Sequence, residues 1–327
     1  MSAKTRLGCP EDERYAIIAI NYNHIIRKES ESMHFAPVSI EDKDLFDHYL
    51  AMRKQQLITY IFTSFFMWKD WEFFRWCLLD GALCIKSDFF GYDAVLPPLA
   101  ADDQVVLQAT ESLIAWYRQR NVPFLLKDVS PEMLQLYQKA WPNRFEVKEI
   151  RPGANYIYKQ EDLALLPGKK YHKKRNHLSA FLRTYPNHCF LPMTKELIPA
   201  CEQYIHEWFA QHKISEDLIW EKHGLMQGLK YFERLSYVGC CLIVNDRIEG
   251  LTFGEPLNDE IFAVYAEKAN QTINGIYAAI NKHFSQEYAK GYAYINRAED
   301  MGHPGLTKAK QSYHPHHLAM QYCLLLK

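Results

Sequence analysis

The amino-acid sequence predicts an α/β fold with mixed sheets, divided into two tandem domains. Its 327 residues exceed the roughly 100–200 residues of a single domain. The composition, with 48% hydrophobic and 24% charged residues, is typical of a globular chain that can bury substantial cores. The order of apolar runs and amphipathic stretches also repeats, because each half ends strand, helix, strand, helix, strand. Strands that alternate with helices favour a partly parallel sheet in each half.

The first half contains two clear helix-start signals. Ser39 precedes acidic residues, and Ser130 precedes Pro131 at a first helical position. Helices are therefore predicted at 40–49, over the periodicity of 106–117, and from 131 onward. Short apolar runs at 77–85 and 92–96, around Gly81 and Gly91, are consistent with strands and turns, and further strands are predicted at 124–126 and 145–150. The aromatic-rich run at 58–68 is closed by charged residues, so it is interpreted as a buried segment and not as a membrane span.

The second half repeats this order. Helices are predicted at 196–212, 273–284 and 305–312, and strands at 237–244, 248–253, 261–266, 292–295 and 318–326. The pair Asn245-Asp246 between two of these strands is a typical hairpin turn. The matching order of the halves indicates a duplication.

We divide the chain into three parts. Residues 1–32 are polar and end in a charged run before Met33, so they form an N-terminal extension. Residues 33–154 form the first domain, and residues 155–327 form the second, which carries the site. The turn at 100–103 in the first domain is acidic, which indicates a mainly structural role for that domain.

Charge and cysteine content exclude several classes of protein. A net charge of −1 gives the molecule no overall basic field for nucleic acid or membranes, so any such binding needs a local patch. No signal peptide and no apolar run of ~18 residues is visible. The eight cysteines form no CxxC pair and mostly lie in apolar runs, which favours reduced thiols and a cytoplasmic location. The histidines at 314–317 lack a cysteine or carboxylate at ligand spacing, so no metal site is expected.

The densest basic segment begins after Pro167-Gly168. It combines charged and amide side chains that could bind phosphates: Lys169, Lys170, Lys173, Lys174, Arg175 and Asn176. Apolar residues fall on one side of the predicted helix and the basic residues crowd the rest. The alternative interpretation is an ordinary solvated helix face.

A second polar cluster follows the strand predicted at 292–295. A strand should deliver Asn296, Arg297, Glu299 and Asp300 to its carboxyl end, where ligands of partly parallel sheets usually bind. Glycines then turn the chain into a short helix, which would contribute further candidates for binding an oxyanion or a substrate: Gly305, Lys308, Lys310, Ser312 and Tyr313. The alternative interpretation is a salt-bridged, capped turn.

A third and weaker candidate is the strand-to-helix turn after residue 266. Its polar and small residues are Glu267, Lys268, Asn270, Gly275 and Tyr277. A phosphate-binding turn is usually rich in glycine, and this one has a single glycine, so an ordinary connection explains it equally well. No GxSxG, GxxxxGK[ST] or GxGxxG motif is present.

Three motifs together resemble a known family. The segments LPGKKYHKKRNHLSAF, EKANQTINGIYAAIN and INRAEDMGHPGLTKAKQSYHP are similar to bacterial proteins of unknown function that resemble the C-terminal domain of phosphatidylglycerol lysyltransferase. The resemblance covers roughly residues 33–327. It implies two tandem domains of the acyl-CoA N-acyltransferase (GNAT-like) fold, an arrangement shared with the Fem peptidyltransferases, which use aminoacyl-tRNA.

The resemblance implies a transferase, and three hypotheses follow. The first is transfer of an amino acid from aminoacyl-tRNA to an amine or hydroxyl, with Glu299 or Asp300 as base and Lys308 or the helix start near Gly305 stabilising the oxyanion. The second is acyl-CoA-dependent N-acylation of a small molecule, although the turn at 270–275 lacks the [RQ]xxGx[GA] loop that grips CoA. The third is a non-catalytic binding module with the same fold.

Overall fold

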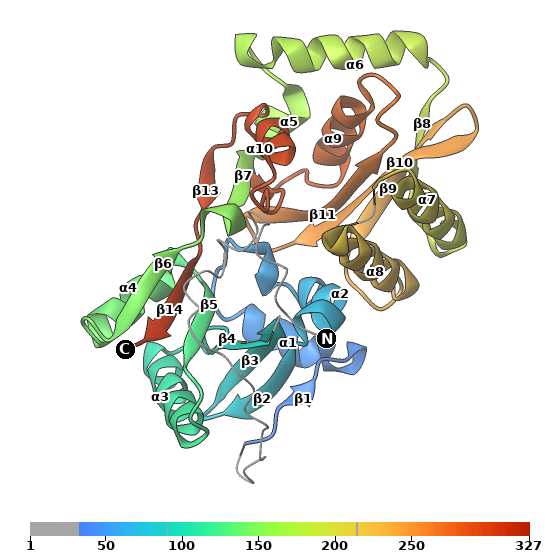
Figure 1. Cartoon of the computed structure of the whole chain (residues 1–327). Helices are drawn as coiled ribbons and strands as arrows, with labels where there is room; N and C mark the ends of the chain where they lie inside the picture. Colours follow the sequence, from blue (N-terminus) through green and yellow to red (C-terminus); the bar gives the residue numbers. More distant parts are fainter. Residues whose placement is uncertain (1–32, 90, 214) are drawn as a thin grey trace.

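The described residues form two seven-stranded sheets that lie side by side (Figure 1). The computed structural model describes residues 33–89, 91–213 and 215–327, so the predicted extension at 1–32 lies outside the described residues. The first sheet consists of β1 (Ala36–Pro37), β2 (Arg75–Leu79), β3 (Ala82–Phe89), β4 (Tyr92–Val95), β5 (Leu125–Val129), β6 (Phe145–Glu149) and β14 (Tyr322–Leu326). The second consists of β7 (Asn155–Lys159), β8 (Cys189–Pro192), β9 (Val238–Val244), β10 (Arg247–Pro256), β11 (Ile261–Ala269), β12 (Tyr294–Asn296) and β13 (His317–Ala319).

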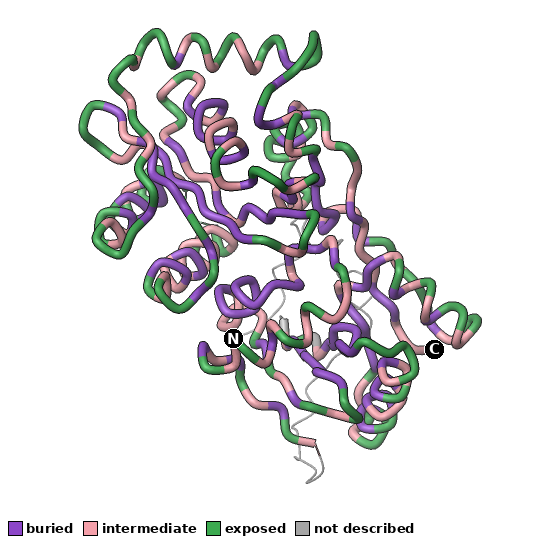
Figure 2. Tube along the Cα trace, turned by 180° about the vertical axis from the view of Figure 1, so that it is seen from behind, coloured by how far each residue is buried: buried purple, intermediate pink, exposed green. Residues whose placement is uncertain are grey.

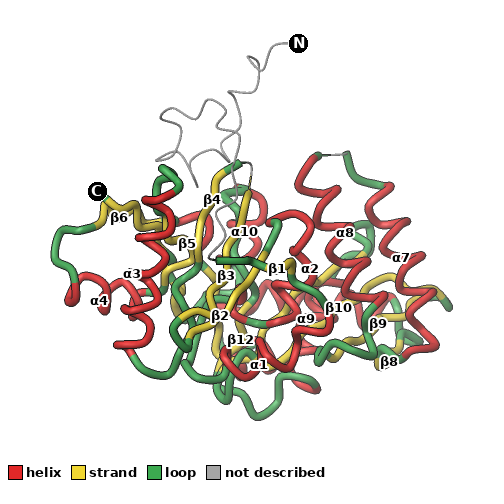
Figure 3. Tube along the Cα trace, turned by 90° about the horizontal axis from the view of Figure 1, so that it is seen from below, coloured by secondary structure: helices red, strands yellow, loops and turns green. Residues whose placement is uncertain are grey.

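The helices cover these sheets, and four of them in each half occur at matching places in the strand order, whereas α5 and α6 have no counterpart in the first half. They are α1 (Lys43–Leu50), α2 (Phe62–Glu72), α3 (Asp103–Gln119), α4 (Pro131–Ala140), α5 (Gln160–Leu165), α6 (His172–Thr184), α7 (Ile198–Ala210), α8 (Glu216–Lys230), α9 (Ile276–Glu287) and α10 (Pro304–Gln311). Figure 3 places α3 and α4 at one end of the molecule and α7 and α8 at the other. The helix start predicted at Ser130 is confirmed. The Ser130 hydroxyl accepts a hydrogen bond from the Met133 amide, and Pro131 is the first residue of α4.

Both sheets have the same strand order. The first runs β1-β2-β3-β4-β5-β14-β6 and the second β8-β9-β10-β11-β12-β7-β13. Each contains one parallel pair at the same position, β4 with β5 and β11 with β12, and every other pairing is antiparallel. This repeat confirms the predicted fold class of an α/β protein with mixed sheets and two similar halves.

The repeated strand order ends in the chain with β7 for the first repeat and with β14 for the second, and each of these two strands lies in the sheet of the other repeat. β7 follows the last strand of the first half in the chain, yet it lies between β12 and β13 of the second sheet. β14 ends the chain and lies between β5 and β6 of the first sheet. The single strand predicted at 318–326 is therefore wrong: the chain leaves one sheet after Ala319 and enters the other at Tyr322. The exchange ties each half to the other through backbone hydrogen bonds.

The halves also share a continuous apolar core. Its buried residues include Phe66 and Met67 of α2 together with Leu225 and Leu229 of α8. Gly224 permits the close approach of these helices, because a Cβ there would lie 3.1 Å from the Met67 carbonyl oxygen. Figure 2 shows the buried residues gathered in the interior of the molecule, and the central strands β3, β7, β9, β10 and β11 are mostly buried. The segment at 58–68 is part of this core, as predicted.

Candidate functional site

The two parallel strands of the second sheet separate at their carboxyl ends. β11 and β12 pair only over three residues, ending at Ala263 opposite Asn296. β11 then continues beside β10, whereas the amide of Arg297 donates to the carbonyl of Tyr156 on β7. The sheet therefore opens between the two strands, at the edge where the sequence placed its polar cluster.

A β-bulge turns Glu267 toward this opening. In the β10–β11 register, Phe253 pairs with Ala266 and Gly254 with Val264, so Tyr265 has no partner across the ladder. One extra residue reverses which side chains face each side of the sheet beyond it. Glu267 consequently faces α9, while Lys268 lies on the opposite face, 4.3 Å from the centre of the Trp208 ring and 2.7 Å from Glu221.

Glu267 joins two side chains from different elements. One carboxylate oxygen lies 3.0 Å from Nη2 of Arg297, and the other accepts a hydrogen bond of 3.1 Å from Nδ2 of Asn281 on α9. The Arg297 guanidinium lies 5.0 Å from the centre of the Tyr313 ring. We call the five residues that meet here the strand-end cluster: Lys174, Glu267, Asn281, Arg297 and Tyr313.

Two atoms of this cluster are buried without a hydrogen-bond partner. They are Nη1 of Arg297, a donor, and Oδ1 of Asn281, an acceptor. Asn281 is only 3% exposed. An unpaired buried polar group costs about 1–3 kcal/mol, and such groups are rare in folded proteins. The cluster therefore presents one donor and one acceptor that a ligand could satisfy.

Lys174 reaches the cluster from α6. Its ammonium lies 3.8 Å from the centre of the Tyr313 ring, a cation–π contact. Burial, and then the neighbouring charge of Arg297, lowers the pKa of Lys174 to about 8. A lysine with such a pKa is partly neutral near physiological pH, so it can take up a proton in catalysis.

Three predicted site residues serve as buried structural groups. Asp300 accepts hydrogen bonds from Tyr156, Thr307 and the amide of Gly302. Burial opposes its ionisation, but these hydrogen bonds outweigh burial and lower the pKa of Asp300. Lys310 donates to the backbone carbonyls of residues 297 and 299. Asn296 donates to the backbone carbonyl of Gln56 and to the side-chain Oδ1 of Asn155, and the bond to Gln56 joins the halves.

The remaining candidates of this segment lie nearer the surface. Gly305 and Lys308 are exposed on α10, and Glu299 is half-buried. The hydroxyl of Ser312 donates to the carbonyl of Ala309 at the end of α10. Among the described residues, none of these four makes a hydrogen bond or ion pair with Arg297 or Glu267.

The start of α9, the third candidate, is covered by α6. Gly275 has a φ of 84° and carries the helix start against α6, since a Cβ there would lie 2.1 Å from the carbonyl oxygen of His177. The side chain of His177 also lies 3.0 Å from that of Asn274. Asn270 donates to Glu249, and the hydroxyl of Tyr277 donates to the carbonyl of residue 269. These contacts hold the turn closed.

Replacing Gly275 by alanine should therefore loosen α6 from α9. The added Cβ meets backbone, which cannot rotate away, and the positive φ is itself unfavourable for alanine. We expect a loss of about 2–4 kcal/mol in the free energy of unfolding, measured by urea denaturation. The control is Gly305→Ala on α10, where the Cβ meets open space. Equal stability of the two variants would contradict the tight contact.

The basic segment divides into an inner and an outer part. Lys174 points inward, and Arg175 donates to the carbonyls of Leu166 and Gly168, which fixes the turn before α6. Lys170 pairs with Asp162 at 3.0 Å. The exposed polar side chains left for a ligand are Lys169, Lys173 and Asn176.

In the first half, side chains of that half occupy the position that corresponds to this opening. Lys127 follows the last parallel pair of β4 and β5, as Arg297 follows that of β11 and β12. Its ammonium lies 2.6 Å from Glu72 and is 3.5 Å from the hydroxyl of Ser87. That the chemistry belongs to the second half stays a prediction.

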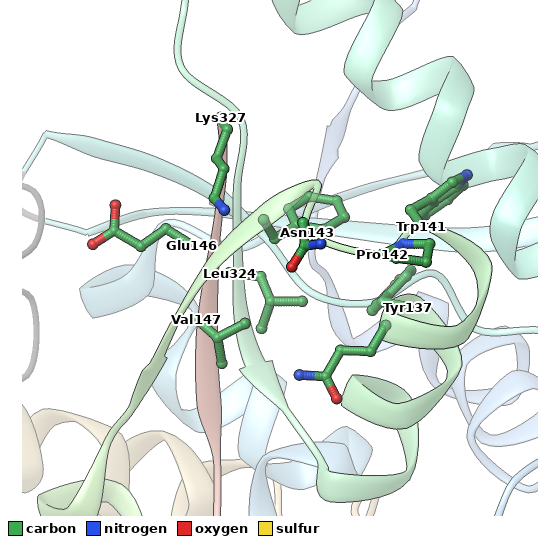
Figure 4. Close-up of a pocket in the computed structure, with 10 residues that line it drawn as sticks. Tyr137, Trp141, Pro142, Asn143, Glu146, Val147, Leu324 and Lys327 are labelled. Atoms are coloured by element: carbon green, nitrogen blue, oxygen red, sulfur yellow. The ribbon is translucent and has the colours of Figure 1, made fainter.

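A separate hollow lies on the first half, away from the cluster (Figure 4). It has a volume of about 510 Å³ and is lined by residues 137–147 together with Leu324 and Lys327. None of the predicted site residues lines it. No group of three or more potential metal ligands occurs among residues 33–89, 91–213 and 215–327, and no helix in these ranges is long and apolar enough to cross a membrane.

The fold is of the acyl- or aminoacyl-transferase type. The C-terminal family of phosphatidylglycerol lysyltransferase matches residues 51–325, and the chain belongs to that family. The predicted family is thus confirmed. Membership of the family does not identify the substrate of this protein.

Three relatives illustrate the family. A conserved protein of unknown function from Bacteroides thetaiotaomicron is 32% identical, with a TM-score of 0.84 over 90% of this chain and 99% of that one. L-PGS from Bacillus licheniformis shares the fold at 15% identity, with a TM-score of 0.65 over 91% and 94%. An uncharacterised protein of Mycoplasmoides gallisepticum is 22% identical over 55% of this chain, and the match spans 59% of that relative's length.

Sequence reasoning missed some members of the cluster. Asn281 was not singled out, although it ends the second motif of the family resemblance. Lys174 was grouped with the outer basic residues. Yet Tyr171, Lys174, Leu178 and Phe181 follow helical spacing along one face, which is the signal that places Lys174 inside.

Proposed function

We propose that this protein transfers an amino acid from aminoacyl-tRNA to an amine or hydroxyl acceptor. The observation that carries the proposal is the buried Arg297–Glu267 pair at the separated strand ends, with an unpaired guanidinium nitrogen and Lys174 nearby. A buried donor that is fixed before the reaction suits a charge that develops only in the transition state.

The proposed chemistry needs no covalent enzyme intermediate. The acceptor nitrogen or oxygen attacks the ester carbonyl carbon, and its proton passes to neutral Lys174. Nη1 of Arg297 stabilises the oxyanion, and the bond from the carbonyl carbon to the ribose oxygen then breaks. Lys174 returns the proton to that oxygen, so the products are the aminoacylated acceptor and free tRNA.

These roles differ from those expected from the sequence. Asp300 is a poor base because three donors stabilise its carboxylate and lower its pKa. Lys308 is exposed on α10, whereas Arg297 offers a buried donor for the oxyanion. Glu299 remains a second candidate for the base.

The exposed residues at the start of α6 would bind the phosphates of tRNA. Changing Lys169 and Lys173 together to alanine should weaken binding of charged tRNA and lower the slope of log affinity against log salt by about two. Fluorescence anisotropy at several salt concentrations measures both effects. The matched control changes Lys139 and Lys327, two exposed lysines beside the first sheet. An unchanged salt slope in the α6 variant would exclude this surface.

Acyl-CoA is the less favoured donor. A pyrophosphate bound at the start of α9 would have to displace α6, because the His177 carbonyl lies directly against Gly275. The test incubates the purified protein with aminoacylated tRNA and with acetyl-CoA, each with a mixture of small amines, and follows loss of the labelled donor group. Turnover of aminoacyl-tRNA alone supports the proposal. Turnover of acetyl-CoA alone would overturn it, and turnover of neither favours a binding module.

A further inference from the structure

We propose that Asn281, oriented by Glu267, binds the free α-amino group of the donor amino acid, so that the site selects aminoacyl donors over simple acyl and N-blocked ones. This inference rests on the proposed aminoacyl transfer and adds the chemical class that the site requires. It assigns a binding role to Asn281, a buried residue of α9 whose side-chain oxygen has no partner.

The orientation of the Asn281 amide follows from its neighbour. An ionised carboxylate only accepts hydrogen bonds, so the amide nitrogen must be the atom that faces Glu267. The amide oxygen then points away from Glu267. With 97% of the residue buried, water does not readily satisfy this oxygen, and a ligand donor is the natural partner.

The unpaired atoms match the polarity of an aminoacyl ester. Such an ester carries N–H donors on its α-nitrogen and a carbonyl acceptor two bonds away. Asn281 Oδ1 offers the acceptor and Arg297 Nη1 the donor, and Glu267 links the two side chains. An α-amino group has an ordinary pKa near ~7.7–8.0, and it donates hydrogen bonds in either protonation state. A simple acyl group would leave the Asn281 oxygen unpaired.

Discrimination between donors should therefore depend on Asn281. A site built to hydrogen-bond one group rejects analogues that lack it, because its own buried atoms are then left unpaired. The probes are three stable adenosine amides whose 3′-nitrogen carries a free aminoacyl group, the same group acetylated on its α-nitrogen, or the corresponding acyl group without nitrogen. We expect the full-length protein to bind the free amine at least about tenfold more tightly than the others by calorimetry.

The decisive variant is Asn281→Leu, which removes the acceptor and keeps the volume. It should bind all three probes within about threefold of one another, whereas the matched control Asn274→Leu, an exposed asparagine of the preceding turn, should keep the full preference. If Asn281→Leu fails to fold, Asn281→Ser replaces it, and melting curves decide which variant is used.

Two outcomes would overturn the inference: equal binding of the three probes by the unaltered protein, or an undiminished preference in the folded Asn281 variant. Transfer from charged tRNA is measured in parallel with native and with N-acetylated aminoacyl-tRNA. Transfer from both forms at equal rates would overturn this inference but would still support the proposed function. Absence of any transfer, with no probe bound, removes both.

Discussion

Replacing Arg297 by lysine is expected to lower the rate of aminoacyl transfer by about 10²–10³-fold, as for loss of one oxyanion donor. The guanidinium holds Glu267 with Nη2 and leaves Nη1 free in the same plane. A lysine ammonium lacks this fixed fork, so it can keep the ion pair or reach the substrate but not both in the same geometry. Single-turnover transfer from charged tRNA measures the effect on the chemical step.

The control for this substitution is Arg247→Lys, which should leave the rate unchanged. Arg247 lies on β10 of the same sheet and forms an exposed ion pair with Glu207 of α7. Melting curves of both variants separate loss of catalysis from loss of folding. An Arg297→Lys variant that is less stable but transfers at nearly the original rate would assign Arg297 a purely structural role.

The elements of the fold could largely be predicted because their signals are local. Capping residues, Pro131 at a helix start and the Asn245-Asp246 turn each act within a few residues, and the structure has all three as predicted. The strand exchange could not be predicted in this way. The sequence predicts no strand at β7 and joins β14 to β13 as one strand. Both segments are short, and two of the strands that they pair with, β12 and β5, lie more than a hundred residues away in the chain.

The same difference between local and long-range signals decides which site residues could be predicted. The sequence placed Glu267, Arg297 and Tyr313 among the candidates, because polar residues at the ends of predicted strands stood out. It could not distinguish Arg297 from Asp300, since only the contacts reveal that one has an unpaired atom and the other three donors. The bulge at Tyr265, which turns Glu267 to the α9 face, also depends on register and not on residue type.

Deleting residues 320–327 is expected to unfold the first half of the chain. β14 lies in the interior of the first sheet, where it pairs with β5 on one side and with β6 on the other. Leu324 is fully buried in the apolar core of that half. Without β14, two strands lose their partners and this core opens to water. Even Leu324→Ala alone should cost about 2–5 kcal/mol of unfolding free energy.

The strand exchange also predicts that the second half loses stability together with the first. Because β7 belongs to the second sheet and is continuous in the chain with β6, loss of the first sheet should destabilise the second. Urea unfolding of Leu324→Ala should then give one transition at lower urea by both tryptophan fluorescence and circular dichroism. Removal of Lys327 alone, an exposed residue, is the matched control. Two separate transitions, with the second half unmoved, would mean that the halves fold independently despite the exchanged strands.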